Sequence, residues 1–213
     1  LTDRSPLAPL TGLRTPFAGL MLDRPLVAGI LNVTPDSFSD GGLAYGTEAA
    51  IAQGRRLIAE GADILDIGGE STRPGADDVS AAEQIDRVLP VIEALASGGV
   101  PLSVDTRSAR VMAAAIAAGA AIMNDVSALT HDPDALGVVA ASGASVILMH
   151  SRGTPRTMLG QSGYEDVLTE VYAALEDRVR ACLNAGIPRG RIAVDPGIGF
   201  AKTGEQNLVL LRD

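Results

Sequence analysis

Six short runs of apolar, β-branched residues each end on an amide, an acid or a histidine. The polar residues that end them are Asn32, Asp66, Asp105, Asn124 with Asp125, His150 and Asp195. Each run follows a Gly, Pro or charged turn and precedes a stretch that is compatible with a helix. This alternation predicts repeated strand-helix units around a parallel sheet that is buried on both faces.

The repeated units predict an α/β fold, a (β/α)8 TIM barrel of which the chain covers about six of the eight units. In such a barrel the strand ends meet at the C-terminal face, where the loops surround one pocket. An open doubly wound sheet is the alternative, but its ligands collect at one switch point, whereas here every strand end carries a polar residue. We therefore expect residues 1–213 to form a single barrel domain that is incomplete at its C-terminus.

The expected elements follow from periodicity and from turn and cap signals. Strands are expected at 26–32, 63–68, 101–105, up to 124, 145–150 and 191–195. Helices are expected from about 47 to 61, from a capping box at 80–83, and over 108–119, 134–141 and 164–185. A second capping box at 203–206 predicts a last helix.

Charge and composition exclude several classes of protein. The net charge of -9 and the dispersed 17 basic residues disfavour binding to nucleic acid and to anionic membranes. The single Cys182 cannot form an intrachain disulfide, and two histidines without metal spacing do not support a zinc site. No apolar run is long enough for a bilayer and no secretion signal is evident, so we expect a cytoplasmic protein.

Two loops carry most of the candidate chemistry. The polar segment 34–42, TPDSFSDGG, is either a binding loop or an ordinary loop, since any loop is rich in Pro, Asp, Ser and Gly. The segment 68–75, GGESTRPG, offers backbone and hydroxyl donors and Arg73, which can bind phosphate or carboxylate through two hydrogen bonds. A turn with a surface arginine is the alternative. Neither segment matches a dinucleotide or P-loop pattern.

Three strand ends suggest a site for a flat heterocycle. Asp105, Asn124 and Asp195 end the third, fourth and sixth expected strands, so a barrel would direct them at one cavity. Carboxylates accept two hydrogen bonds side by side and an amide both donates and accepts, which complements the edge of an aminopyrimidinone. Each of the three could instead cap a neighbouring helix.

In six ordered blocks the chain resembles the dihydropteroate synthase family of folate biosynthesis. The blocks span 30–42, 66–76, 103–106, 123–128, 148–158 and 195–202. The first two are highly specific, whereas the third, fourth and sixth would also suit pterin-binding methyltransferases. The resemblance implies a pterin-binding TIM-barrel transferase that joins 6-hydroxymethyl-7,8-dihydropterin diphosphate to 4-aminobenzoate and releases pyrophosphate.

The resemblance also implies residue roles. It gives Asp105, Asn124 and Asp195 as ligands of the pterin edge and Asn32 as the ligand of Mg²⁺ and the diphosphate. Met149 and Phe200 resemble the pocket walls, Asp36 lies in the first loop, and Thr72, Arg73 and Pro74 lie in the second. Lys202 matches a lysine of the sixth loop and is expected among the substrate-binding residues, but the resemblance does not say what it does there. Asp36, Arg73 and Asp105 are the expected catalytic residues.

Partners and alternatives complete these expectations. The resemblance implies inhibition by sulfonamides, which mimic 4-aminobenzoate, and a homodimer for the full-length protein. The family's later Ser-Arg-Lys and Arg-x-His blocks are not found in this sequence. The alternatives are a methyltetrahydrofolate-corrinoid methyltransferase and a homologue that binds pterin without catalysis.

Overall fold

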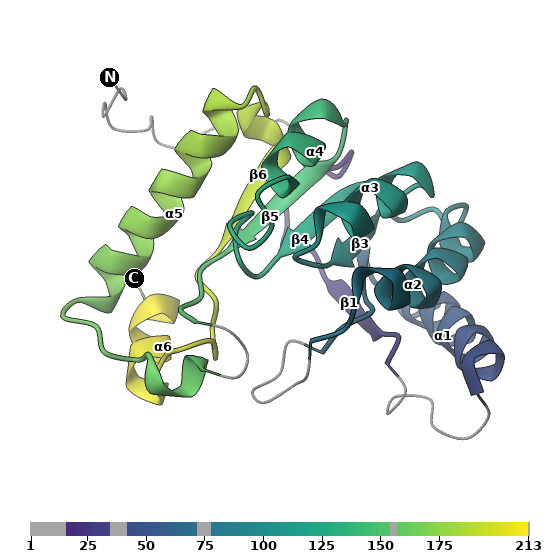
Figure 1. The fold of residues 1–213 in the computed structure, drawn as a ribbon, viewed down its shortest axis with the longest axis horizontal. Helices are drawn as coiled ribbons and strands as arrows, with labels where there is room; N and C mark the ends of the chain where they lie inside the picture. The colour runs from purple at the N-terminus through teal and green to yellow at the C-terminus, as the bar shows by residue number, and fades with distance from the viewer. Residues whose placement is uncertain (1–15, 35–41, 72–77, 154–156, 213) are drawn as a thin grey trace.

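One parallel sheet and its flanking helices make up the part of the chain that the structure describes. A computed structural model describes residues 16–34, 42–71, 78–153 and 157–212 (Figure 1). The strands are β1 (Ala28–Asn32), β2 (Ile64–Gly68), β3 (Leu102–Asp105), β4 (Ile122–Asp125), β5 (Ser145–Met149) and β6 (Ile192–Asp195). The helices are α1 (Gly42–Ala59), α2 (Ala81–Leu95), α3 (Ala109–Ala117), α4 (Ala135–Ala141), α5 (Val167–Asn184) and α6 (Gly204–Arg212).

The strands pair in chain order, from β1 to β6, and every pair is parallel. Each strand is joined to the next through a helix, so the chain forms six consecutive units of a TIM-type barrel. The predicted α/β fold and the six-unit alternation are therefore confirmed. Because all strands run in one direction, all their carboxyl ends lie at the same edge of the sheet.

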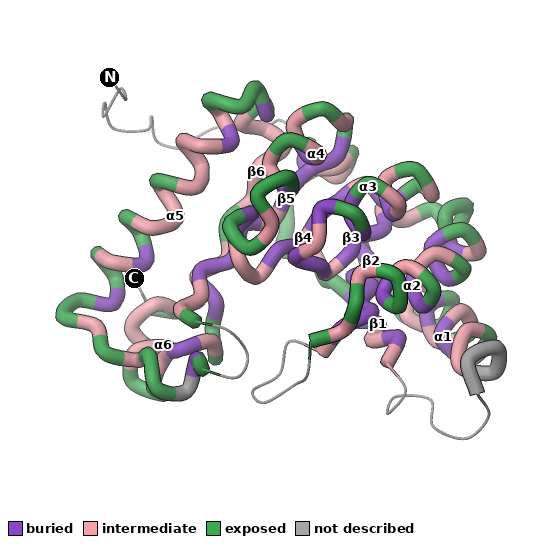
Figure 2. Tube along the Cα trace, in the orientation of Figure 1, coloured by how far each residue is buried: buried purple, intermediate pink, exposed green. Residues whose placement is uncertain are grey.

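The two faces of the sheet pack against different partners. Leu31, Leu65 and Val104 join the main core with residues of α1 to α3, as expected for a face that is covered by crossover helices. Ile64 and Ile122, which alternate with those positions, pack on the opposite, inner face around Phe17. The buried residues are concentrated in the strands and along the helix faces that contact them (Figure 2).

The helix ends follow the cap chemistry of the sequence, with three differences. Helix α1 begins at Gly42, earlier than the predicted start near residue 47. At the start of α6, the Thr203 amide donates to Gln206 Oε1 over 2.8 Å and the Gln206 amide donates to Thr203 Oγ1 over 3.3 Å, a reciprocal capping box. At α2 only half of the predicted box forms, because the Glu83 carboxylate pairs with Arg87. Helix α5 begins at Val167, later than predicted, where Asp166 supplies the cap.

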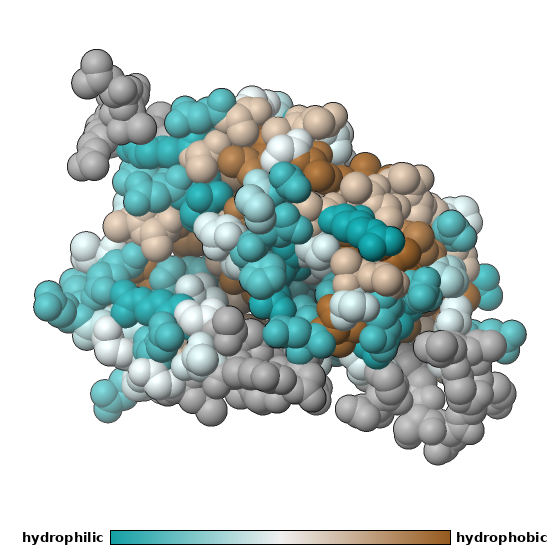
Figure 3. Space-filling view, in the orientation of Figure 1, coloured by the Kyte–Doolittle hydropathy of each residue, from teal (hydrophilic) through white to brown (hydrophobic). Residues whose placement is uncertain are grey.

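The surface is mixed rather than uniformly apolar. Figure 3 shows hydrophilic side chains over α5 and a patchwork of apolar and polar side chains over α3 and α4. Among the described residues, no helix combines the length and the apolar character that a membrane crossing requires. Cys182 is buried on α5.

Candidate active site at the carboxyl ends of the strands

The structure brings five of the predicted site residues to one edge of the sheet. Asn32 and Asp105 both flank Gly68 in the strand register, and Asp105 is in turn paired with Asn124. Further along the sheet, Met149 is paired with Asp195. These residues all stand on the inner face of the sheet, because they alternate with the positions that pack against the helices.

Four predicted site residues cannot be placed in this way. Asp36, Thr72, Arg73 and Pro74 lie outside the described residues. The described residues next to them are informative, because Ser71 follows β2 and Asp78 precedes α2. The second predicted loop therefore starts and ends beside the carboxyl end of β2.

A buried polar cluster lies on the inner face beneath the strand ends. Asn124 Nδ2 donates to Asp66 Oδ2 over 2.9 Å. Ser103 is completely buried and is paired with Asp66 in the register of β2 and β3. Within the described part of the chain, four buried side-chain oxygens have no hydrogen-bond partner. Three of them belong to this cluster, namely Asp66 Oδ1, Ser103 Oγ and Asp105 Oδ1. Orphaned buried oxygens are costly and indicate a ligand with matching donors.

The electrostatics of this cluster favour neutral carboxyl groups in the absence of a ligand. Burial raises the pKa of Asp105 well above its usual range, and repulsion from Asp66, Asp125 and Glu70 raises it further. Burial also raises the pKa of Asp66. A ligand that donates N–H groups to Asp105 would favour the ionised carboxylate, so binding and ionisation are coupled.

Asp66 and Ser103 were not among the predicted site residues. Asp66 was noted only as the end of an apolar run, although β2 continues to Gly68. A search for polar residues at alternate positions of a strand would have found both, since Asp66 and Gly68 share one face, as do Ser103 and Asp105. Their assignment to the inner face rather than to the helix side still required the structure.

Asp125 is adjacent to Asn124 but has a structural task. Its carboxylate accepts hydrogen bonds from the Ser127 amide at 2.7 Å, the Ser127 hydroxyl at 2.6 Å and the Leu129 amide at 3.1 Å. It therefore organises the turn that follows β4.

Asp195 combines a local role with its position in the site. Its Oδ1 accepts from the Gly197 amide at 2.7 Å, and its backbone oxygen accepts from the His150 amide at 2.9 Å. Phe200 and Lys202 follow in the same loop, and the Lys202 ammonium donates to the backbone oxygens of Gly197 and Phe200, each over 3.0 Å. The structure thus places the end of β5 with Met149 beside the end of β6 with Asp195, and the loop that holds Phe200 and Lys202 follows directly.

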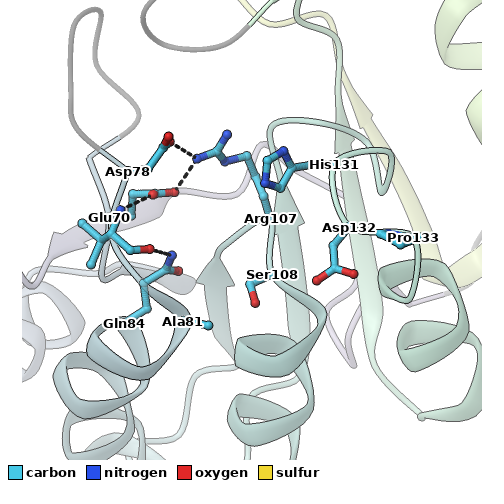
Figure 4. A pocket seen from close by; sticks show the side chains of 10 residues that line it. Glu70, Asp78, Ala81, Gln84, Arg107, Ser108, His131, Asp132 and Pro133 are labelled. Atoms are coloured by element: carbon cyan, nitrogen blue, oxygen red, sulfur yellow. Dashed lines mark hydrogen bonds and ion pairs between the residues drawn. The ribbon is translucent and has the colours of Figure 1, made fainter.

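A buried ion pair fastens both described ends of the second loop. Arg107, which follows β3, donates to Glu70 Oε2 over 2.9 Å and pairs with Asp78 over 3.1 Å (Figure 4). Glu70 Oε1 accepts from the Val79 amide at 2.9 Å. Glu70 and Arg107 are only 5% and 8% exposed. The sequence analysis missed this pair, because an arginine after a strand end carries no signal of its distant partner.

Both residues of this ion pair line a surface cavity of ≈ 520 Å³. Figure 4 shows Arg107 and His131 on one side of this cavity and Glu70 and Gln84 on the other. The residues that line it include none of the predicted substrate ligands. The cavity therefore lies beside the strand-end cluster rather than within it.

The residues that could hold a metal are few. Among the described residues, no group of three or more His, Cys, Asp or Glu side chains is arranged around a common point. Asn32 Oδ1 lies over Gly68, 3.5 Å from the position that a Cβ would take there. It is a hard oxygen ligand of the kind that Mg²⁺ accepts together with water and phosphate oxygens.

The sequence and the fold both match known proteins. The family described as pterin binding enzyme matches residues 28–213. A dihydropteroate synthase of Synechocystis is 46% identical over 190 residues, which cover 89% of this chain and 66% of that protein. The chain therefore spans slightly less than two thirds of the length of this relative.

Solved structures agree with the sequence match. A Xanthomonas albilineans dihydropteroate synthase with 4-aminobenzoic acid superposes with a TM-score of 0.84 at 52% identity, covering 92% of this chain and 70% of that one. A Yersinia pestis dihydropteroate synthase with a sulfonamide drug complex also has a TM-score of 0.84, at 46% identity, covering 91% of this chain and 71% of that one. The chain belongs to the pterin-binding enzyme family and, within it, to the dihydropteroate synthases.

Proposed function

We propose that the protein is a transferase that condenses 6-hydroxymethyl-7,8-dihydropterin diphosphate with 4-aminobenzoate to form 7,8-dihydropteroate and pyrophosphate. The observation that carries this proposal is the inner-face cluster of Asp66, Asp105 and Asn124 with its unpartnered buried oxygens. An aminopyrimidinone edge offers adjacent N–H donors and one carbonyl acceptor, which matches two carboxylates and an amide. The family membership and the 4-aminobenzoic acid in the Xanthomonas structure support the same substrates.

The reaction requires positioning more than acid-base chemistry. The bond between the methylene carbon and the diphosphate oxygen breaks, and its electron pair leaves with pyrophosphate. The arylamine nitrogen forms the new bond to the methylene carbon and then loses a proton. In this proposal Asp105, Asn124 and Asp195 hold the pterin, and Met149 and Phe200 form its apolar walls. Excluding water until the amine attacks protects the electron-poor carbon.

Charge on the leaving group must be neutralised as it departs. Bound Mg²⁺ would supply Lewis-acid stabilisation of the diphosphate oxygens. We propose Asn32 as its protein ligand, with Arg73 and Thr72 as donors to the diphosphate and Pro74 and Asp36 in the loops that contact the substrates. The roles of Asp36, Thr72, Arg73 and Pro74 are proposed because segments 34–42 and 68–75 resemble two loops of the family.

Three further expectations belong to the proposal. A sulfonamide should compete with 4-aminobenzoate, as the Yersinia structure with a sulfonamide suggests. The full-length protein should be a homodimer in the cytoplasm. Residues 1–213 should belong to one pterin-binding domain.

The experiment is an assay of dihydropteroate and pyrophosphate formation with and without Mg²⁺. We expect equal amounts of both products, competitive inhibition by a sulfonamide, and loss of turnover in excess EDTA. Asp105→Asn and Asp195→Asn should each weaken pterin binding about tenfold or more, since each loses a charge-assisted hydrogen bond. Methyl transfer from methyltetrahydrofolate, or pterin binding without pyrophosphate release, would instead identify the methyltransferase or the non-catalytic homologue.

A further inference from the structure

Lys202 is the single lysine of the chain, and all other basic residues among the 17 are arginine. Its half-buried ammonium donates to the backbone oxygens of Gly197 at 3.0 Å, Phe200 at 3.0 Å and His150 at 3.3 Å. The fourth contact is with His150 Nδ1 at 3.1 Å. A compact ammonium can donate hydrogen bonds to several acceptors that surround one point, whereas the planar guanidinium group of arginine cannot.

These contacts join two segments that are distant in the sequence. His150 follows β5, whereas Gly197 and Phe200 belong to the loop between β6 and α6. Gly197 has a φ of +71°, and a Cβ built on it would collide with the backbone oxygen of His150. The loop between β6 and α6 therefore packs closely against the end of β5. The Lys202 ammonium lies between these two segments and contacts both.

The ammonium has no donor left for a substrate. It carries three N–H bonds, and four protein acceptors lie within 3.3 Å of its nitrogen. The charged groups that act on it are Asp195, which attracts it, and Arg152, which repels it. Arg152 follows β5 and Asp195 ends β6, so both charged groups lie on the two segments that Lys202 joins.

We propose that Lys202 is a positioning residue, which holds the β6–α6 loop on the end of β5 so that Met149, Asp195 and Phe200 form one rigid wall of the pterin site. This inference rests on the proposed pterin-binding function and assigns a role to a residue for which the family resemblance supplies none. Lys202 acts through its neighbours and does not contact the diphosphate. A direct role in diphosphate binding is the competing explanation.

Two ligands separate these explanations. The affinity of the protein for 6-hydroxymethyl-7,8-dihydropterin diphosphate and for 6-hydroxymethyl-7,8-dihydropterin, which lacks the diphosphate, would be measured by calorimetry. Lys202→Met should weaken both ligands by the same factor, about tenfold or more, because the shared pterin contacts are displaced. A loss confined to the ligand with the diphosphate would overturn the proposal in favour of direct contact.

Two further variants test the geometry without depending on Lys202→Met alone. Lys202→Arg keeps the positive charge but not the compact shape, so we expect it to bind both ligands as weakly as Lys202→Met does. If only the charge mattered, Lys202→Arg would bind the ligand with the diphosphate as tightly as the wild type. Gly197→Ala keeps the Lys202 side chain in the sequence, but its Cβ would displace the loop from the end of β5. It should therefore weaken the binding of both ligands, as Lys202→Met does. Should Lys202→Met fail to fold, these two variants decide the question.

A matched control is Arg56→Met, which removes a basic residue from an exposed ion pair with Glu60 on α1 and should change neither affinity. Normal pterin affinity in both Lys202→Met and Gly197→Ala, with their folding confirmed by circular dichroism, would overturn the inference while leaving the proposed function intact. A wild-type protein that binds neither ligand would overturn the proposed function and this inference with it.

Discussion

The side-chain amide of Asn124 on β4 donates to the Asp66 carboxylate on β2 over 2.9 Å, past the intervening strand β3. This bond fixes the rotation of the amide, because its nitrogen is held toward Asp66. The amide oxygen, an acceptor, and the second N–H of the amide nitrogen, a donor, then remain for a ligand, in fixed directions. Asp66 thus sets which edge of a heterocycle Asn124 can recognise, although Asp66 itself is 8% exposed and lies deeper in the sheet.

Asp66→Asn should weaken pterin binding about tenfold or more. An amide at this position can present a donor to Asn124, so the Asn124 side chain loses its preferred rotation. Calorimetric titration with 6-hydroxymethyl-7,8-dihydropterin checks this. Asp86→Asn, on the exposed face of α2, is the matched control and should bind like the wild type. Equal affinities in the two variants would show that Asp66 does not orient Asn124.

Asp105→Asn should raise stability at neutral pH while it weakens pterin binding. Burial, with repulsion from Asp66, Asp125 and Glu70, raises the pKa of Asp105, so the folded protein binds this proton more tightly than the unfolded chain. The contribution of Asp105 to stability therefore falls as pH rises above about 4, the usual aspartate range, through its folded pKa. Thermal melts at pH 4 and pH 7 measure this effect. A variant that melts below the wild type at pH 7 would contradict it.

His150 should make stability fall in mild acid. Burial, with the positive charges of Lys202 and Arg152, lowers the pKa of His150 from 6.5 to about 4. Since the unfolded chain binds this proton more tightly, stability is lost as pH falls below 6.5 toward about 4. The expected loss from His150 between pH 7 and pH 5 is about 2 kcal/mol.

The comparison of wild type with His150→Gln isolates this contribution. Glutamine does not titrate and can still accept from Lys202 through its amide oxygen. Urea denaturation at pH 7 and pH 5 should therefore show a smaller loss of unfolding free energy in the variant. Identical losses in the two proteins would mean that His150 is not held neutral by the fold.

Arg107→Met should destabilise the protein by about 3 to 5 kcal/mol, because it leaves the buried Glu70 carboxylate without its partner. Urea denaturation measures the loss. The double variant Glu70→Gln with Arg107→Met should recover part of it, since the uncompensated charge is gone. Arg56→Met breaks an exposed pair, which solvent screens, and should cost far less than Arg107→Met. A similarly small loss of unfolding free energy in Arg107→Met would show that the buried pair of Glu70 and Arg107 does not stabilise the fold.

The order of the elements and the identity of the residues at the strand ends could be predicted from the sequence alone. Apolar runs alternate with amphipathic stretches in a pattern that permits only a parallel sheet with crossover helices, and parallel strands bring their carboxyl ends to one edge. Asn32, Asp105, Asn124 and Asp195 could therefore be predicted to lie at this edge, whereas Met149 was expected there only from the family resemblance. Local signals likewise predicted the cap at Thr203 and Gln206, because capping involves residues only three positions apart.

Which polar groups contact one another is seen only in the folded protein. Asn124 and Asp125 are adjacent, yet one points into the barrel and the other into a turn, because strand register assigns successive side chains to opposite faces. Asp66 meets Asn124 across 58 residues, Glu70 meets Arg107 across 37, and His150 meets Lys202 across 52. No local pattern encodes such contacts, since they depend on how neighbouring strands are aligned and how closely their loops approach.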